Sequence, residues 1–203
     1  MLSDRFGRSI DYLRLSVTDR CDLRCFYCLP KGFTDFEEPD HWLTFDEIER
    51  VVAAFARLGT RRIRITGGEP LVRKDLPQLA ARLATLPGID DLSLSTNATR
   101  LAKHADELHA AGIRRINVSL DSLDGARFKT ITGGKLEKVL DGLMAAKAVG
   151  FAPIKINMVV MKDVNEDEVE AMVDFCIEHS FTLRFIETMP MGDTGRSATD
   201  HYV

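Results

Sequence analysis

Tyr12-Leu-Arg-Leu-Ser-Val-Thr18 is followed, after two residues, by Cys21-Asp-Leu-Arg-Cys25-Phe-Tyr-Cys28. The first segment alternates apolar and polar side chains and is rich in residues that favour β structure, which predicts a strand with one buried face. The second segment holds three of the chain's four cysteines in a C-x3-C-x2-C pattern. Functional groups of parallel α/β folds gather at the carboxyl ends of the strands, so this cysteine loop predicts a functional site.

The spacing of the cysteines indicates a metal centre. Thiolates are soft ligands that suit iron–sulfur clusters and zinc. Three of them can hold three corners of a cubane cluster and leave the fourth iron open to chemistry. The alternative is a zinc or four-cysteine cluster site whose last ligand lies elsewhere. The remaining cysteine, Cys176, follows Met172 and Val173 on an apolar helical face and is typical of a core residue. A disulfide framework is disfavoured because three cysteines cannot all pair with one another.

Six β-rich segments alternate with helical patterns, which predicts βαβ units and a parallel sheet. The predicted strands cover residues 12–18, 61–66, 91–96, 114–120, 154–161 and 182–187. The first predicted helix runs from the capping box Thr44-x-x-Glu47 to Gly59. The later ones cover residues 75–86, 100–112, 124–130, 135–150 and 165–177, with Asn165 as the N-cap of the last.

The alternation of side chains within the strands separates two architectures. A doubly wound sheet carries helices on both faces, so its strands are apolar on both sides. Here one face is polar in strand after strand, and Arg14, Arg64, Ser95, Asn117 and Lys155 belong to it. A closed eight-stranded barrel takes about 250 residues, whereas this chain has 203. The pattern predicts an α/β fold, a partial (βα)6 TIM-like barrel with parallel strands around a polar lumen.

Basic side chains within the predicted strands are the second unusual feature. Charged groups are rarely buried without partners. Arg14, Arg64 and Lys155 have the parity of the lumen. Arg184 shares its face with Ile186, so its direction stays open. Converging cations suit a polyanion such as a triphosphate. The alternative is a set of ion pairs with acidic residues near the strand ends, namely Glu69, Asp121 and Glu187.

Gly67-Gly68-Glu69-Pro70 follows the second predicted strand. Paired glycines have no Cβ, so a ligand can approach their backbone closely. The alternative interpretation is a tight turn from strand to helix. The motif alone does not separate the two interpretations. The cysteine loop, which the fold is expected to place beside it, favours a ligand contact.

The C-x3-C-x2-C pattern, with an aromatic residue just before the last cysteine, resembles the signature of radical S-adenosylmethionine (SAM) enzymes. The segments YLRLSVTDRC, RITGGEPLVRKDL, NVSLDSLD and LRFIETMPMG are together similar to the GTP 3',8-cyclase family of molybdenum cofactor (molybdopterin) biosynthesis. The resemblance extends over residues 4–187. It implies a radical SAM lyase that converts GTP to (8S)-3',8-cyclo-7,8-dihydroguanosine 5'-triphosphate. It also implies a [4Fe-4S] cluster, SAM and a low-potential electron donor.

The resemblance further implies roles for individual residues. The implied cluster ligands are Cys21, Cys25 and Cys28. The implied SAM contacts are Gly67, Gly68 and Glu69 for the methionine, Tyr27 (through its main chain) and Met189 for the adenine, and Ser119 for the ribose or carboxylate. The implied GTP contacts are Arg14, Arg64, Lys155, Arg184 and Ser95, the last at a position where the family commonly has Thr.

One departure from the family concerns its second [4Fe-4S] cluster, which three further cysteines hold near the C-terminus. This chain has no second cysteine set. We therefore expect it to be the N-terminal part of such an enzyme. Residues 1–190 are then the radical SAM core, and residues 191–203 begin a C-terminal region that is otherwise absent. SAM binding is expected to survive, whereas cyclisation of GTP by this chain alone stays open.

Two other functions remain open. The first is a different radical SAM enzyme, such as a peptide maturase, and the basic residues of the implied GTP site argue against it. The second is a non-enzymatic iron–sulfur electron-transfer module with four protein ligands. The presence of only three clustered cysteines argues against that module.

Composition limits the partners and the compartment. The net charge is −4 and no long basic run occurs, so nucleic acid is not an expected partner. No apolar run approaches the ~20 residues of a membrane span, and the polar residues 1–8 do not resemble a secretory signal. Few cysteines, clustered as ligands, favour a reducing cytoplasm. The oligomeric state stays open, and a homodimer is one option.

Overall fold

The computed structural model describes residues 2–28, 32–187 and 201. Within these ranges, six parallel strands form one sheet in the order β1-β2-β3-β4-β5-β6. The strands are β1 (Tyr12–Ser16), β2 (Arg62–Thr66), β3 (Asp91–Thr96), β4 (Arg115–Ser119), β5 (Ile154–Val160) and β6 (Thr182–Glu187). Each of them lies inside its predicted range, and their common direction confirms the predicted parallel sheet.

Helices connect successive strands in the described part of the chain. They are α1 (Phe45–Arg57), α2 (Leu76–Ala84), α3 (Leu101–Ala110), α4 (Gly125–Thr132), α5 (Leu136–Val149) and α6 (Val169–His179). Short 3-10 helices occur at η1 (Pro39–His41), η2 (Pro70–Val72) and η3 (Glu166–Glu168). None of the described helices has both the length and the apolar character needed to cross a membrane.

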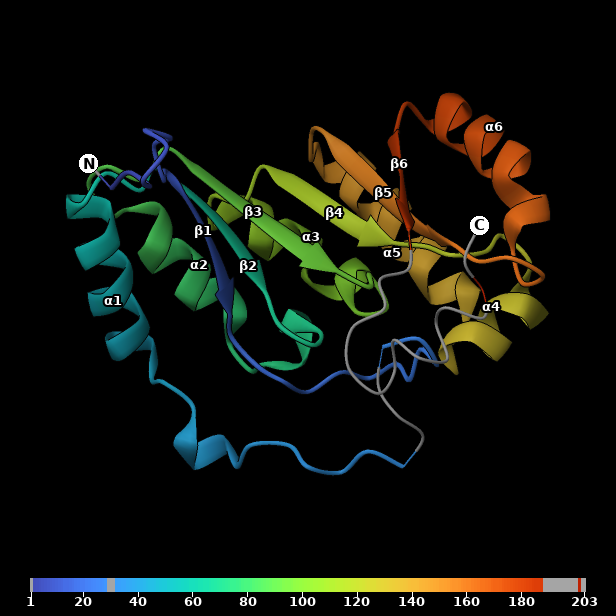
Figure 1. Ribbon diagram of the computed structural model, residues 1–203, viewed down its shortest axis with the longest axis horizontal. Helices are drawn as coiled ribbons and strands as arrows, with labels where there is room; N and C mark the ends of the chain where they lie inside the picture. Colours follow the sequence, from blue (N-terminus) through green and yellow to red (C-terminus); the bar gives the residue numbers. More distant parts are fainter. Residues whose placement is uncertain (1, 29–31, 188–200, 202–203) are drawn as a thin grey trace.

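The sheet is curved and open (Figure 1). Among the described strands, β1 pairs only with β2 and β6 only with β5, so the two edges do not meet. Helices α1, α2, α3 and α5 follow one side of the sheet in Figure 1. This arrangement confirms the predicted partial barrel.

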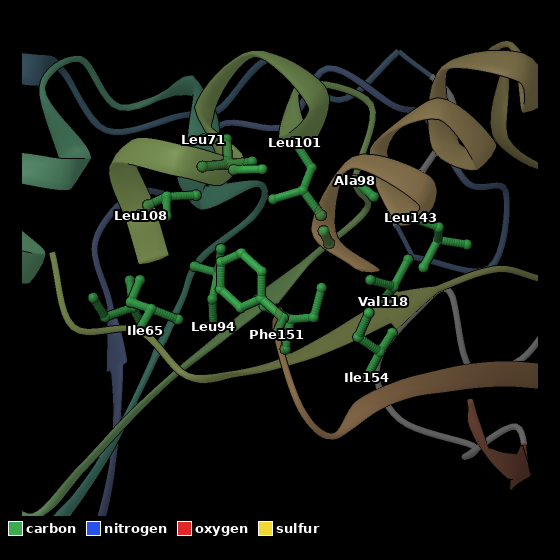
Figure 2. Close-up of a cluster of buried hydrophobic side chains, with 14 of the residues drawn as sticks. Ile65, Leu71, Leu94, Ala98, Leu101, Leu108, Val118, Leu143, Phe151 and Ile154 are labelled. Atoms are coloured by element: carbon green, nitrogen blue, oxygen red, sulfur yellow. The ribbon is translucent and has the colours of Figure 1, made fainter. Parts of the chain in front are cut away.

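The apolar face of the sheet packs under the helices. Strand residues with no exposed area are Ile63, Ile65, Leu94, Ile116, Val118, Ile156 and Met158. Figure 2 shows part of this core, where Leu101 of α3 and Leu143 of α5 approach strand residues Leu94 and Val118. Each fully buried aliphatic side chain contributes roughly 1.5–3 kcal/mol. Since alternate residues of a strand share a face, this burial directs the polar residues to the opposite, helix-free face.

The N-terminus of α1 carries the predicted capping box. The Thr44 hydroxyl accepts a hydrogen bond from the Glu47 N–H at 3.3 Å, and the Glu47 carboxylate accepts one from the Thr44 N–H at 2.8 Å. Gly59 follows the helix in the left-handed conformation, with φ 105°. Both predicted ends of this helix are confirmed.

Asn165 stands at the N-cap position of η3, directly before α6, but the prediction that its side chain caps the helix is wrong. Its side chain is fully buried and makes no cap hydrogen bond. The amide nitrogen donates instead to the carbonyl oxygens of Asp121 at 2.7 Å and Val159 at 2.9 Å. The amide oxygen accepts from the N–H of Met161 at 2.8 Å. Buried backbone groups need partners, and this one side chain satisfies three of them where the chain leaves β4 and β5.

Gly142 lies in α5 at the point where α5 meets the start of α3. A Cβ atom at this position would lie 2.4 Å from the carbonyl oxygen of Ala98 and 3.1 Å from the Cβ of Leu101. The contact between the two helices therefore requires a residue without a side chain.

We expect Gly142→Ala to destabilise the protein by about 1–3 kcal/mol, because the new methyl group would meet a backbone carbonyl that cannot rotate away. The sign is opposite to that of an open helix position, where alanine is better than glycine by about 1 kcal/mol. Urea unfolding followed by circular dichroism measures the difference. Gly125→Ala at the start of α4 is the control, because its nearest contact would lie at 3.9 Å. Equal stability of Gly142→Ala and the wild type would contradict the packing argument.

Candidate functional site

A cavity of about 490 Å³ lies at the carboxyl ends of the strands. The predicted site residues that line it are Arg14, Cys21, Cys25, Tyr27, Cys28, Arg64, Gly67, Gly68, Ser95, Ser119 and Arg184. Glu69 and Lys155 are not among its lining residues, and Met189 lies outside the described residues. Apart from these three, the predicted site residues come together at one cavity, and they belong to β1, β2, β3, β4, β6 and the loops that follow β1 and β2.

The cysteine loop docks on the end of α4. Backbone hydrogen bonds join the loop to the last turn of this helix. Leu23 is buried and packs so closely on Gly134 that a Cβ there would lie 2.4 Å from the Leu23 Cδ2. The Tyr27 hydroxyl donates to the Asp121 carboxylate at 2.6 Å, which ties the other end of the loop to β4. These contacts hold the three thiols at the wall of the cavity.

Gly67 and Gly68 face the backbone that leads into the cysteine loop. A Cβ at Gly67 would lie 2.4 Å from the carbonyl oxygen of Thr18, and one at Gly68 would lie 2.4 Å from that of Arg20. The Gly68 N–H donates to the Thr18 oxygen at 2.8 Å. Close packing of the two loops therefore explains the need for glycine. Since both glycines also line the cavity, the turn and the ligand-contact interpretations are compatible.

Glu69 is fully buried behind the glycine turn. One carboxylate oxygen accepts from the Leu71 N–H at 3.0 Å and from the Thr96 hydroxyl at 2.7 Å, and the other accepts from the Asn97 N–H at 2.6 Å. Burial raises the pKa of the carboxyl to about 7, against these hydrogen bonds, which lower it. Because the side chain does not line the cavity, we propose that Glu69 supports the turn and does not itself touch a ligand.

The cation group is defined as Arg14, Arg64, Lys155 and Arg184. The three arginines line the cavity, and Lys155 lies near enough to Arg64 and Arg184 to be affected by their charges. Among the described residues, no member of this group forms an ion pair with a carboxylate. The predicted alternative, in which these cations pair with Glu69, Asp121 or Glu187, is therefore not observed in the described part of the chain. Desolvation lowers the pKa of Lys155, and the positive charges of Arg184, Arg115 and Arg64 lower it further. Lys155 therefore lies close enough to these arginines for their positive charges to act on it.

Arg184 points toward the lumen, which decides the direction that its parity left open. One of its guanidinium nitrogens donates to the Asn117 Oδ1 at 2.5 Å. The Nε atoms of Arg64 and Arg184 are buried and have no hydrogen-bond partner in the described part of the chain. A buried donor without a partner costs about 1–3 kcal/mol. Two such donors in one cavity indicate a site for an acceptor-rich ligand.

Two asparagines of the polar face, which were not among the predicted ligand contacts, belong to this site. Asn117 is buried and holds Arg184. Asn157 lines the cavity, and its Oδ1 is buried without a partner among the described residues. The signal that could have found them was their parity, since Asn117 aligns with Lys155 and Asn157 aligns with Arg184 in the sheet register.

The family model described as "Radical SAM superfamily" matches residues 15–176 of this chain. The chain belongs to the radical SAM superfamily. Membership brings the cofactors of the superfamily, a [4Fe-4S] cluster and SAM.

Curated relatives of this radical SAM chain carry one name. The GTP 3',8-cyclase of Hydrogenovibrio crunogenus is 52% identical over 99% of this chain and 62% of the relative. That of Listeria monocytogenes is 46% identical over 100% of this chain and 61% of the relative. GTP 3',8-cyclase 1 of Pseudomonas aeruginosa is 50% identical over 98% of this chain and 60% of the relative. The radical SAM chain thus spans about 60% of the length of these relatives.

Solved structures confirm the fold of the radical SAM chain. SuiB of Streptococcus suis bound to S-adenosylmethionine has a TM-score of 0.69 at 24% identity, over 86% of this chain and 38% of that one. The protein anSMEcpe with bound AdoMet has a TM-score of 0.70 at 18% identity, over 89% of this chain and 52% of that one. At these identities the likeness shows the fold alone.

The cysteines of the radical SAM chain fit an iron–sulfur cluster. All three are free, and burial raises the pKa of Cys25 to about 12 and raises those of Cys21 and Cys28. A bound cation would favour the thiolate form of these cysteines, against the effect of burial. Among the described residues, no three Cys, His, Asp or Glu side chains converge closely enough for one metal ion. A cubane cluster spaces its thiolates more widely, because each binds a different iron. Three thiols from one loop at the wall of the cavity are a donor set that suits an iron–sulfur cluster.

We expect the buried carboxyl of Glu69 to make the metal-free protein less stable as the pH rises from about 4.5, its ordinary pKa, to about 7, its pKa in the fold. Between these values the folded state binds more protons than the unfolded state, so its stability falls with rising pH. The full effect is about 3 kcal/mol. Urea unfolding at several pH values measures it.

Glu69→Gln is expected to remove the contribution of Glu69, which is roughly half of the pH dependence that the two buried carboxyls Glu69 and Asp121 produce together. The rest comes from Asp121, because burial also raises the pKa of that carboxyl, to about 6, and it stays in the variant. An unchanged pH dependence in Glu69→Gln would show that the pKa of Glu69 is the same in the folded and unfolded states.

Proposed function

We propose that the chain is the radical SAM core of a GTP 3',8-cyclase, which converts GTP to (8S)-3',8-cyclo-7,8-dihydroguanosine 5'-triphosphate. The observation that carries the proposal is the position of Arg64 and Arg184, which line the same cavity as the three cysteines and keep buried, unpartnered Nε atoms in the described chain. A triphosphate supplies the charge and the acceptors that these groups lack. The names of the curated relatives support the same substrate.

The cofactor side of the proposed site is the cysteine loop with the glycine turn. Cys21, Cys25 and Cys28 would hold the cluster. When bound, the cluster and SAM supply the reductive cleavage whose 5'-deoxyadenosyl radical takes the 3' hydrogen of the GTP ribose. The backbone of the turn at residues 67 and 68 would receive the SAM methionine. The adenosine contacts proposed from the resemblance are Tyr27, Ser119 and Met189.

The substrate side of the proposed site is the polar face of the sheet. Arg14, Arg64 and Lys155 would bind the phosphates of GTP, and Arg184 would do so from the orientation that Asn117 gives it. Ser95 lines the cavity and would contribute its hydroxyl. The protein's task is to orient the ribose and base and to exclude competing reactions, since the cofactors supply the difficult chemistry.

The remaining parts of the proposal concern the whole protein. The relatives are longer than this chain, so residues 1–190 are proposed as the core and residues 191–203 as the start of a further region. A low-potential electron donor and a cytoplasmic location complete the proposal. The unpaired arginines favour a nucleotide over the peptide substrate of a maturase, and the SAM chemistry separates the proposal from a pure electron-transfer module.

The function is tested by anaerobic reconstitution with iron and sulfide, followed by SAM and dithionite with and without GTP. Chromatography follows 5'-deoxyadenosine and the cyclised nucleotide. 5'-Deoxyadenosine without cyclised GTP supports a radical SAM core that needs residues outside this chain for the substrate. Both products show that the chain is sufficient. Neither product from a loaded cluster would overturn the proposal for this chain.

We expect Cys21→Ser, Cys25→Ser and Cys28→Ser each to abolish cluster assembly, because a cubane cluster with only two protein ligands is not held. Bound iron, bound sulfide and visible absorbance after reconstitution measure the loss. Cys176→Ala is the matched control, since this buried cysteine lies in α6 and does not line the cavity. A cluster lost in Cys176→Ala but kept in Cys25→Ser would refute the assignment.

Arg64→Ala is expected to weaken GTP binding roughly ten- to hundredfold, as loss of a charge-assisted contact does. SAM binding should change less than about threefold, because the substitution does not touch the cysteine loop or the glycine turn. Isothermal titration calorimetry under anaerobic conditions measures both. Arg61→Ala is the control, since Arg61 is exposed and paired with Asp90. Equal losses of GTP and SAM binding in Arg64→Ala would make Arg64 structural.

A further inference from the structure

Asn97 follows β3 and reaches the cysteine loop. Its side-chain nitrogen Nδ2 donates to Asp22 Oδ1 at 2.8 Å and to the sulfur of Cys21 at 3.7 Å. The residue is buried, with 8% of its surface exposed. The Leu23 N–H donates to the same sulfur at 3.4 Å. The Cys21 sulfur therefore receives one hydrogen bond from its own loop and one from a side chain in the loop that follows β3.

The orientation of the Asn97 amide is set by its other end. Its oxygen accepts from the Thr99 N–H at 3.0 Å and from the Thr99 hydroxyl at 2.8 Å. A backbone N–H can only donate, so the amide oxygen must face Thr99 and the NH2 group must face Asp22 and Cys21. The Asn97 N–H donates to the buried carboxylate of Glu69, which fixes the residue to the support of the glycine turn.

The carboxylate of Asp22, next to Cys21 in sequence, is compensated. Its second oxygen accepts from the Thr99 hydroxyl at 2.9 Å and from the Arg100 Nε at 3.0 Å. With Asn97, three side chains from the connection between β3 and α3 donate to this carboxylate. These donors offset the negative charge of Asp22 beside Cys21. The group that faces the Cys21 sulfur from the end of β3 is the amide NH2 of Asn97, a hydrogen-bond donor.

We propose that Asn97 is a positioning residue that raises the reduction potential of the cluster through an N–H···S hydrogen bond to the Cys21 thiolate. The inference rests on the proposed cluster ligands. Reduction adds one negative charge to the cluster, and the thiolates share it. A donor aimed at a thiolate stabilises the reduced form more than the oxidised form, so hydrogen bonds to the sulfurs set the potential.

The test is the midpoint potential of the reconstituted cluster, from a redox titration followed by electron paramagnetic resonance in the absence of GTP. Asn97→Leu keeps the approximate volume and removes the amide. We expect a more negative midpoint potential, seen as an about three- to tenfold lower ratio of reduced to oxidised cluster at a fixed solution potential. A residue with only a structural role would change cluster content and leave the potential in place.

Thr99→Val is the matched control. It removes a hydroxyl that lies within hydrogen-bond distance of both Asp22 and Asn97 and can donate its single hydrogen to either, and it leaves the amide beside Cys21. Both variants take one donor from the Asp22 carboxylate, but only Asn97→Leu takes one from the sulfur. We therefore expect the potential of Thr99→Val to equal that of the wild type.

Equal potentials in Asn97→Leu and the wild type overturn the inference, as do equal shifts in Asn97→Leu and Thr99→Val. Asn97→Ser is the second variant if Asn97→Leu assembles no cluster. If neither assembles one while Thr99→Val does, Asn97 is structural and the inference is also overturned. A wild-type chain without a cluster would instead overturn the proposed cluster ligands and this inference with them, which separates the two failures.

Discussion

Two loops meet backbone to backbone at the carboxyl end of the sheet, and the site depends on this contact. The turn after β2 donates N–H groups to the carbonyl oxygens of Thr18 and Arg20, and only glycine lets it come so close. The cysteine loop begins at the next residue, so the contact sets where the thiols lie relative to the polar face of the sheet. Glu69 extends the connection to β3 through the backbone of Asn97.

The polar face is electrostatically incomplete in the described part of the chain. Arg64 and Arg184 each keep a buried Nε without a partner, and their like charges lower the pKa of Lys155 after desolvation has lowered it. Native proteins satisfy nearly all of their buried polar groups, so the exceptions mark places where a partner is to be expected. A polyanionic ligand would offset the cost, whereas the apolar face on the other side of the sheet needs no ligand to be stable.

Local patterns were sufficient where burial alone decides the outcome. The alternation predicted the strands β2 to β5, because every second side chain there is buried. The sixth strand was predicted from its β-rich composition, and its side chains are largely exposed. The capping box at Thr44 was predictable because its partner, Glu47, lies only three residues away in the sequence. Asn165 is also a residue type that commonly caps helices, but its side-chain amide donates to the buried carbonyl oxygens of Asp121 and Val159 instead. Local sequence could not predict this, because Asp121 lies 44 residues away in the chain.

Motif spacing and strand parity were sufficient to predict the architecture, the superfamily and most of the residues that line the cavity. Both are local properties, and the parallel topology brings the strand ends to one edge of the sheet. Tertiary structure alone decided what those residues touch. It placed Glu69 behind the turn, turned Arg184 toward Asn117 and brought Asn97 to the sulfur of Cys21. These contacts join residues far apart in the chain, and their geometry depends on how loops from neighbouring strands compete for the same buried hydrogen bonds.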